Sequence, residues 1–210
     1  MLTNQEVIAL NWELDGKFKY PNLVRIRTIP DGSCLFHAII KAFFKPYIIG
    51  YLDGKPLDRS QFVRDLRKEL SELLDKPAVG GKTYYQLLAR GNLEAQANDK
   101  TNPMREASLE AMKEVLNSYE PVNELFDEFI SNVLDKDIYM LDSKTKDIYM
   151  HPDRNSGLLY KNRQSIILLD LHGHYELIGV MRSGKIYTHF DANDSLILSI
   201  KQRMDIFQST

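Results

Sequence analysis

The hydrophobic pattern of the chain changes near residue 137, and this change constrains the fold more than any other feature. Before it, apolar residues recur at positions i, i+3, i+4 and i+7, which is the spacing of amphipathic helices. After it, the chain consists of short runs rich in β-branched and aromatic residues, a composition typical of strands. Because helices and strands are segregated along the sequence, the pattern predicts an α+β domain.

Five helices are predicted in the first part of the chain from periodic apolar positions and end signals. Asp58 or Ser60 can cap the second helix. Gly91 can close the third, and Asn102 with Pro103 can open the fourth. The predicted segments are 34–44, 58–77, 83–91, 102–118 and 122–136. A further short helix is predicted in "IKQRMDIF", close to the last residue.

Strands are predicted in the last part of the chain. The motif "KDIYM" occurs at 136–140 and again at 146–150, separated by the turn-forming "LDSKT", which indicates a hairpin. Ser183 and Gly184 mark a second tight turn. The other predicted strands lie in "QSIILLDL", "HGHYELIGVM" and "IYTHFDA".

The length and charge of the chain limit the classes of protein it can be. We expect one domain over residues 1–210, with its core at about 20–200. The formal net charge is −2, from 27 basic and 29 acidic side chains, so there is no electrostatic case for a nucleic-acid partner. No apolar stretch approaches the ~20 residues of a membrane helix, so we expect no membrane partner. The N-terminal "MLTNQEVIALNWELDG" lacks a basic segment, so we expect no signal peptide.

Cys34 is the only cysteine, which excludes an internal disulfide and any zinc site with more than one thiolate. A chain without disulfides favours a reducing compartment, so we expect it in the cytosol or nucleus. It has no Walker loop, no glycine-rich dinucleotide turn and no HExxH motif, so we expect neither a metal nor an organic cofactor. It also has no coiled-coil heptad, so we expect a monomer.

The local sequence around Cys34, "DGSCLFHAIIKAFF", favours a nucleophile. Gly32 allows a tight turn, after which Cys34 falls in the first turn of a helix. Unpaired N–H groups and the positive end of the helix dipole gather there, and we expect them to lower the thiol pKa and to be able to hold an oxyanion. The alternative is that Cys34 only fills the core, since cysteine is among the most buried residue types.

A catalytic thiol needs a base, and the segment "HGHYELIGV" is the best source of one among the five histidines. In an extended strand, His172, His174 and Glu176 would share one face, so that the carboxylate could orient an imidazole. The alternative is a polar strand face at the edge of a sheet. His37, three residues after Cys34, is interpreted as an ordinary polar helix position.

Two of these segments resemble a known family. "DGSCLFHAI" resembles the Asp-Gly-x-Cys-Leu-Phe signature of the ovarian tumour (OTU) cysteine proteases, and "HYELIGV" is similar to their C-terminal histidine block. "LRKEL" is a weaker match to a recurrent helical segment, and the likeness spans roughly residues 25–195. The ending "GHYELIGV…GKIYTHF" is similar in style to OTU domains of large DNA viruses, in which case the protein would act in the host-cell cytosol. A eukaryotic or bacterial-effector source is left open.

The resemblance implies a papain-like α+β fold with an N-terminal catalytic-cysteine helix, a helical arm, and a C-terminal, mostly antiparallel sheet that carries the catalytic histidine. It also implies a deubiquitinase that cleaves isopeptide or peptide bonds at the C-terminal glycine of ubiquitin. Its partners would be ubiquitin or polyubiquitin conjugates, with ubiquitin-like modifiers as further candidates. The helical arm would face ubiquitin.

The resemblance assigns roles to four residues. Cys34 is the nucleophile, His174 the general base and acid, and Asp31 the signature aspartate of the segment that shapes the oxyanion hole. Glu176 stands where many relatives have Asp or Asn as the third member of the triad. This departure leaves the orienting group open between Glu176, Asp31 and a group from elsewhere. A second departure is His37, where many relatives have Arg.

Three other functions remain open from the sequence. The same fold could bind ubiquitin with little or no catalysis, and the departure at Glu176 favours this. A papain-like deamidase or peptidase for other substrates would share the same catalytic logic. The chain could also be a soluble α+β protein with one buried thiol.

Overall fold

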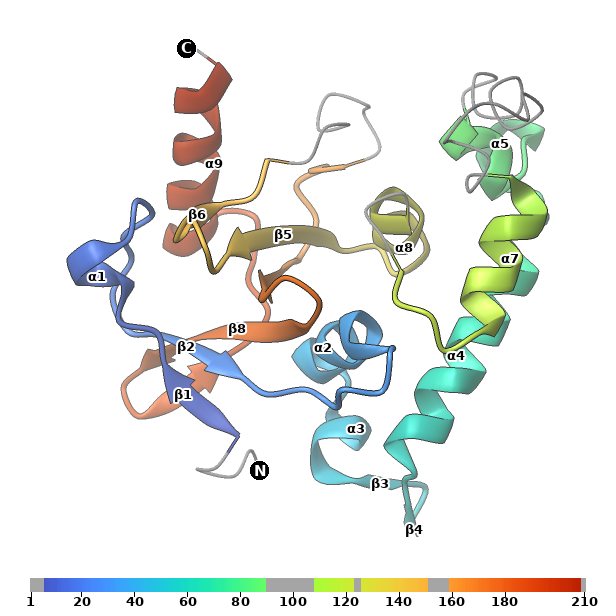
Figure 1. Ribbon diagram of the computed structural model, residues 1–210, viewed down its shortest axis with the longest axis horizontal. Helices are drawn as coiled ribbons and strands as arrows, with labels where there is room; N and C mark the ends of the chain where they lie inside the picture. Colours follow the sequence, from blue (N-terminus) through green and yellow to red (C-terminus); the bar gives the residue numbers. More distant parts are fainter. Residues whose placement is uncertain (1–5, 90–107, 123–125, 151–158, 209–210) are drawn as a thin grey trace.

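A computed structural model describes residues 6–89, 108–122, 126–150 and 159–208 of the chain. Within these residues, a seven-stranded sheet lies between helices, and a pair of long helices extends to one side of it (Figure 1). The sheet strands are β1 (Val7–Ala9), β2 (Leu23–Ile26), β5 (Asp137–Asp142), β6 (Asp147–Ile148), β7 (Ser165–Asp170), β8 (Tyr175–Arg182) and β9 (Lys185–Tyr187). The α+β class and the papain-like arrangement predicted from the sequence are confirmed.

The predicted helices occur in the predicted order, and two short helices, Trp12–Asp15 and Lys45–Ile49, were not predicted. The helices of the first part are α1 (Trp12–Asp15), α2 (Cys34–Phe43), α3 (Lys45–Ile49), α4 (Arg59–Leu73), α5 (Tyr84–Ala89), α7 (Leu109–Asn117) and α8 (Asp127–Val133). A 3-10 turn (Val79–Gly81) precedes α5, and a small hairpin of β3 (Tyr51–Leu52) and β4 (Lys55–Pro56) precedes α4. The last helix, α9 (Ser195–Gln208), begins earlier than the segment predicted for it. None of the helices in the described ranges is both long and apolar enough to cross a bilayer.

The sheet is mostly antiparallel, in the order β1-β2-β8-β7-β5-β6, with β9 paired to β8. One pair, β5 with β7, is parallel. The repeated "KDIYM" motif forms the antiparallel β5–β6 pair, as predicted. The sequence missed β1 and β2, which come from the N-terminal part of the chain and join the sheet through β8. They were missed because they are only three and four residues long, too short for a clear period.

Both faces of the sheet are covered, which explains the unbroken apolar run in β7. Ile166 and Leu168 pack on one face with α2, and Ile167 and Leu169 pack on the other with α9. Successive strand side chains point to opposite faces, so a strand buried on both sides carries no polar alternation. Figure 1 shows α2 below β8, between the sheet and α4.

The pair of α4 and α7 forms the helical arm. Asp58 caps α4 by accepting from the Gln61 N–H at 3.0 Å, which decides between the two predicted caps. Ser108 caps α7 in the same way, through the Ala111 N–H at 3.1 Å. The predicted opening of the fourth helix at residues 102–103 and the predicted stop at residue 91 lie outside the described residues.

Candidate active site

Cys34 is the first residue of α2 and follows a tight loop at residues 31–33. Gly32 in this loop has φ +79°, and a Cβ built on it would lie 1.8 Å from the Tyr119 carbonyl oxygen. Only glycine fits this position, because the backbone is left-handed and its neighbour is main chain. Ser33 stands at the N-cap position but makes no side-chain cap, so it does not take up the first N–H groups of α2.

The Cys34 sulfur is held against the beginning of β8. The Tyr175 N–H donates to Sγ at 3.4 Å, and Cys34 is 5% exposed. Burial raises the pKa of the thiol, and the N–H groups of Tyr175, Leu35 and Cys34 offset this only in part. The expectation that the helix terminus lowers this pKa is therefore wrong in its net direction, since desolvation of the thiolate outweighs the backbone dipoles.

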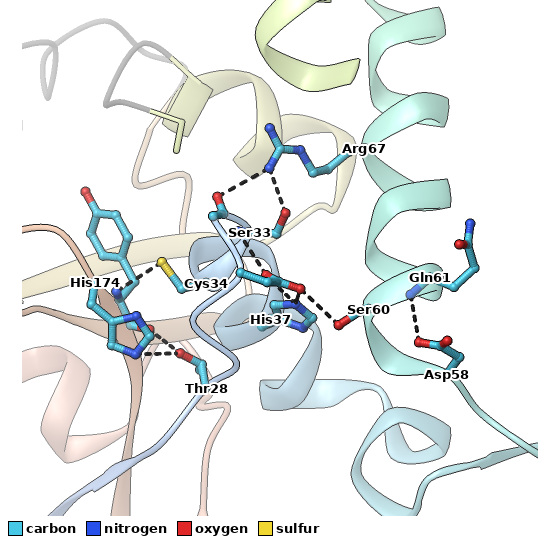
Figure 2. A network of polar contacts seen from close by, with 12 residues as sticks. Thr28, Ser33, Cys34, His37, Asp58, Ser60, Gln61, Arg67 and His174 are labelled. Atoms are coloured by element: carbon cyan, nitrogen blue, oxygen red, sulfur yellow. Dashed lines mark hydrogen bonds and ion pairs between the residues drawn. The ribbon is translucent and has the colours of Figure 1, made fainter. Parts of the chain in front are cut away.

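His174 directly precedes the residue that contacts the sulfur. Because one peptide unit separates the Tyr175 nitrogen from the His174 Cα, the sulfur lies within about 6 Å of that Cα. His174 Nε2 is 3.2 Å from Thr28 Oγ1, and the Thr28 hydroxyl donates to the Tyr175 carbonyl at 2.5 Å. Figure 2 shows the imidazole bonded to the Thr28 hydroxyl and the Cys34 sulfur bonded to the backbone of the next residue. The fold thus brings the two sequence candidates together.

The predicted alignment of His172 with His174 and Glu176 on one strand face is wrong. Strand β8 begins only at Tyr175, and His172 and Gly173 have φ of 58° and 115°. These two residues form the turn between β7 and β8, and a turn with positive φ breaks the two-residue period of a strand. His172 Nε2 instead lies 3.2 Å from Asp142.

Glu176 lies away from the imidazole. Its register partner is Leu169, which belongs to the face of the sheet that packs against α9 rather than α2. The Glu176 Oε2 atom is 3.4 Å from Arg25 Nη1, and the residue is 5% exposed. The Glu176 carboxylate is therefore placed to pair with Arg25, and the contacts of the described residues give no support to Glu176 as the group that orients His174.

Asp31 links the cysteine loop to α2 and α4 through hydrogen bonds. Its Oδ1 accepts from the Ser33 N–H at 3.1 Å, both of its oxygens lie 3.0 Å from His37 Nε2, and Ser60 donates to Oδ2 at 2.9 Å. Burial, the largest single influence, raises the pKa of Asp31, but the bonds from these partners together lower it. Asp31 thus shapes the loop that precedes Cys34.

His37 is not the ordinary polar helix position that the sequence suggested, because its side chain is fully buried. Burial lowers the pKa of His37 although Asp31 opposes this, so the ring is neutral. With the Nε2 proton donated to Asp31, Nδ1 accepts from the Tyr47 hydroxyl at 2.5 Å. The chain Asp31–His37–Tyr47 is a hydrogen-bonded network next to the cysteine loop, in which His37 and Tyr47 are buried and Asp31 is partly exposed.

Among solved structures, OTU domains align with the chain. An OTU domain in complex with ubiquitin aligns with a TM-score of 0.52 and 16% identity, over 97% of this chain and 92% of that one. The OTU domain of OTUD1 aligns with a TM-score of 0.43 and 18% identity, over 75% of this chain and 85% of that one. The viral OTU domain protease from Farallon virus aligns with a TM-score of 0.37 and 12% identity, over 77% of this chain and 94% of that one. No family model and no curated protein matches the chain.

The chain has the fold of an OTU domain. At 16% identity the likeness concerns the path of the backbone, so the role of each side chain has to come from its own contacts. The OTU fold here includes two site residues that the sequence did not single out. They are Thr28, described above, and Arg67 of α4.

Arg67 joins the helical arm to the cysteine loop of this OTU fold. It is 1% exposed and lies over the Phe36 ring, 5.2 Å from its centroid. Its guanidinium donates to acceptors on three segments: Gly32 O (3.4 Å), Ser33 Oγ (2.7 Å), Val115 O (2.6 Å), Leu116 O (3.1 Å) and Glu120 O (2.8 Å). The only sequence signal for it was the "LRKEL" segment in which it lies.

Proposed function

We propose that the chain is a cysteine-type deubiquitinase, which hydrolyses isopeptide or peptide bonds at the C-terminal glycine of ubiquitin. The observation that carries the proposal is the contact of the Cys34 sulfur, at the start of α2, with the residue next to His174, at the start of β8. A thiol beside an imidazole is the minimal pair for acyl transfer. The OTU fold supports ubiquitin as the substrate, because a solved OTU domain of this fold was determined in complex with ubiquitin.

In the proposed reaction, His174 removes the proton from the Cys34 thiol, and the sulfur attacks the glycine carbonyl carbon. The carbonyl oxygen becomes an oxyanion, which N–H groups of the loop at 31–34 stabilise by on the order of 3 kcal/mol per donor. The C–N bond then breaks, and the imidazolium gives its proton to the leaving lysine amine. Water, activated by His174, hydrolyses the thioester and restores the thiol.

Burial of Cys34 bears on how the reaction starts. A thiol whose pKa is raised is neutral in the resting protein, so His174 must act as a general base in the attacking step. This differs from a resting thiolate–imidazolium pair, in which the proton has already moved. The rate of the first step is therefore expected to depend on the position of the imidazole.

The second candidate function is a ubiquitin-binding module of the same fold with little or no catalysis. The specific observation in its favour is the 5% exposure of Cys34, because a nucleophile must be reachable by its substrate. Both functions have ubiquitin as their partner, with ubiquitin-like modifiers as further candidates, and we propose that either operates in the cytosol or nucleus.

One experiment distinguishes the two candidate functions. Ubiquitin with a thiol-reactive group at its C-terminus is incubated with the wild type and with Cys34→Ala. A covalent adduct in the wild type that is missing in Cys34→Ala supports the protease. Binding by calorimetry without an adduct supports the module. If neither binding nor an adduct is observed, ubiquitin is not the partner. Cys34 is the only cysteine, so an adduct needs no further mapping.

A further inference from the structure

We propose that the hydroxyl of Thr28, rather than a carboxylate, positions the imidazole of His174 for catalysis. The proposal concerns the mechanism of the proposed function and in that sense rests on it, but its test below does not require ubiquitin. Thr28 is bonded to the imidazole, so it is a positioning residue that acts through His174.

The hydrogen bonds of Thr28 fix the tautomer of the ring. A threonine hydroxyl has one proton, and here it is donated to the Tyr175 carbonyl oxygen at 2.5 Å. Toward His174 Nε2, 3.2 Å away, the same oxygen can therefore only accept. In the neutral ring, Nε2 then carries the proton and Nδ1 carries the lone pair. A base needs a free lone pair, so this bond leaves Nδ1 as the atom that can take the thiol proton.

The placement of the ring matches this tautomer. Figure 2 shows the bond from Thr28 reaching one nitrogen of the imidazole, so the other nitrogen is the one left for the Cys34 sulfur, which contacts the next residue of the chain. Thr28 thus performs the two tasks of a triad carboxylate, which are to select a tautomer and to fix the direction of the ring.

The end of β2 brings Thr28 to the beginning of β8. Ile26, the last residue of β2, pairs with Leu177, and the hydroxyl of Thr28, two residues further along the chain, donates to the Tyr175 carbonyl. Tyr175 in turn donates its N–H to the Cys34 sulfur. One residue of β8 is therefore bonded through its carbonyl to the positioning hydroxyl and through its N–H to the nucleophile, which gives the three groups a common rigid support.

The carboxylate candidates are placed elsewhere. Glu176 lies against Arg25 on the opposite face of the sheet, and Asp31 is bonded to His37, Ser60 and the Ser33 N–H. A hydroxyl carries no net charge, so it orients the ring without the ion-pair stabilisation that a carboxylate gives to an imidazolium. The site therefore depends on geometry more than on charge.

The test compares Thr28→Val, which removes the hydroxyl at nearly constant volume, with Thr28→Ser, which keeps it. The matched control is Thr188→Val, because the Thr188 hydroxyl likewise donates to a carbonyl, that of Ala42, at 2.7 Å at the other end of α2. Two rates are measured at pH 7. One is alkylation of the only thiol by iodoacetamide, and the other is release of a fluorophore amide from the C-terminus of ubiquitin.

We expect Thr28→Val to slow both rates about tenfold, the equivalent of one hydrogen bond, with the loss in kcat and not in KM. We expect Thr28→Ser to remain within about twofold of the wild type, and Thr188→Val likewise. Wild-type rates in Thr28→Val would overturn the proposal. An equal loss in Thr28→Ser would also overturn it, since the hydroxyl would then not be the relevant group. A tenfold loss in Glu176→Gln would return the role to the carboxylate.

Failure of the proposed function has a different signature. If the wild type does not cleave the ubiquitin substrate, but alkylation is slowed in Thr28→Val and restored in Thr28→Ser, the positioning role stands and the deubiquitinase does not. Thermal unfolding of each variant separates a loss of fold from a loss of rate, and Thr28→Ser remains informative if Thr28→Val does not fold.

Discussion

Removal of the Arg67 guanidinium should destabilise the whole protein, because this side chain links the cysteine loop to two parts of the arm. Five acceptors receive its N–H groups. One of them, Val115 O, also accepts from the Ser118 N–H and hydroxyl and so remains bonded in a variant. Four acceptors then lose a buried, charge-assisted donor.

At about 1 kcal/mol for each of these four groups, Arg67→Met should lower the free energy of unfolding by about 4 kcal/mol. This is a large share of the roughly 5–15 kcal/mol that stabilises a typical domain. Arg67→Lys should lose less, because an ammonium has three donors in place of five and remains charged. The assay is urea unfolding followed by circular dichroism, with the midpoint and the slope both fitted.

The matched control is Arg64→Met, one turn earlier on α4. Arg64 bonds to Gln61 of its own helix and lies 5.7 Å from the Tyr119 ring centroid, on the outer side of the arm. Its removal should cost less than about 1 kcal/mol. If Arg67→Met costs no more than Arg64→Met, then the bonds of Arg67 do not hold the loop to the arm, and the reasoning is refuted.

Three further predictions concern the loop and the thiol. Gly32→Ala should abolish turnover and lower the melting temperature, because its Cβ would lie 1.8 Å from the Tyr119 carbonyl oxygen; wild-type turnover would contradict this. Since burial raises the pKa of Cys34, its alkylation rate should rise with pH through a midpoint above that of free cysteine; a lower midpoint would argue against a neutral resting thiol. Burial acts to raise the pKa of Asp31, but its bonds to His37 and other donors lower it on balance. The resulting stabilisation is present above the unfolded-state pKa of about 3.9 and is lost as the pH falls through the folded-state value. Asp31→Asn should therefore be less stable than the wild type at pH 7 in urea unfolding, with the difference closing below about pH 4; a difference independent of pH would contradict this.

The closeness of Cys34 and His174, the proposed catalytic pair, could be predicted from the sequence because the signals of both residues are local. Cys34 stands in a glycine turn before a periodic apolar helix, and His174 stands just before a strand. The long helices were also predictable, since α4 has a cap and a regular apolar face. These features need no knowledge of what lies opposite them in the fold.

The groups that support the pair could not be found in this way. Thr28 and Arg67 act through partners far away in the chain, at Tyr175 and at residues 115–120, and neither has an unusual local context. The histidine alignment failed because Gly173 permits a turn where the apolar pattern indicated a strand. The predicted direction of the Cys34 pKa shift was wrong because burial depends on the tertiary structure, which the position of the residue at a helix terminus does not reveal.

The position of the reacting groups at one end of β8 leaves its other end free for engineering. The Ser183–Gly184 turn follows the last residue of this eight-residue strand, about 25 Å from Tyr175 at the rise of an extended chain. A Cβ built on Gly184 would meet no heavy atom within 4 Å, so the turn has space around it, although the φ of +74° requires that the glycine itself be kept. A fluorescent label or an affinity handle inserted at this turn would therefore report on the protein without disturbing the thiol.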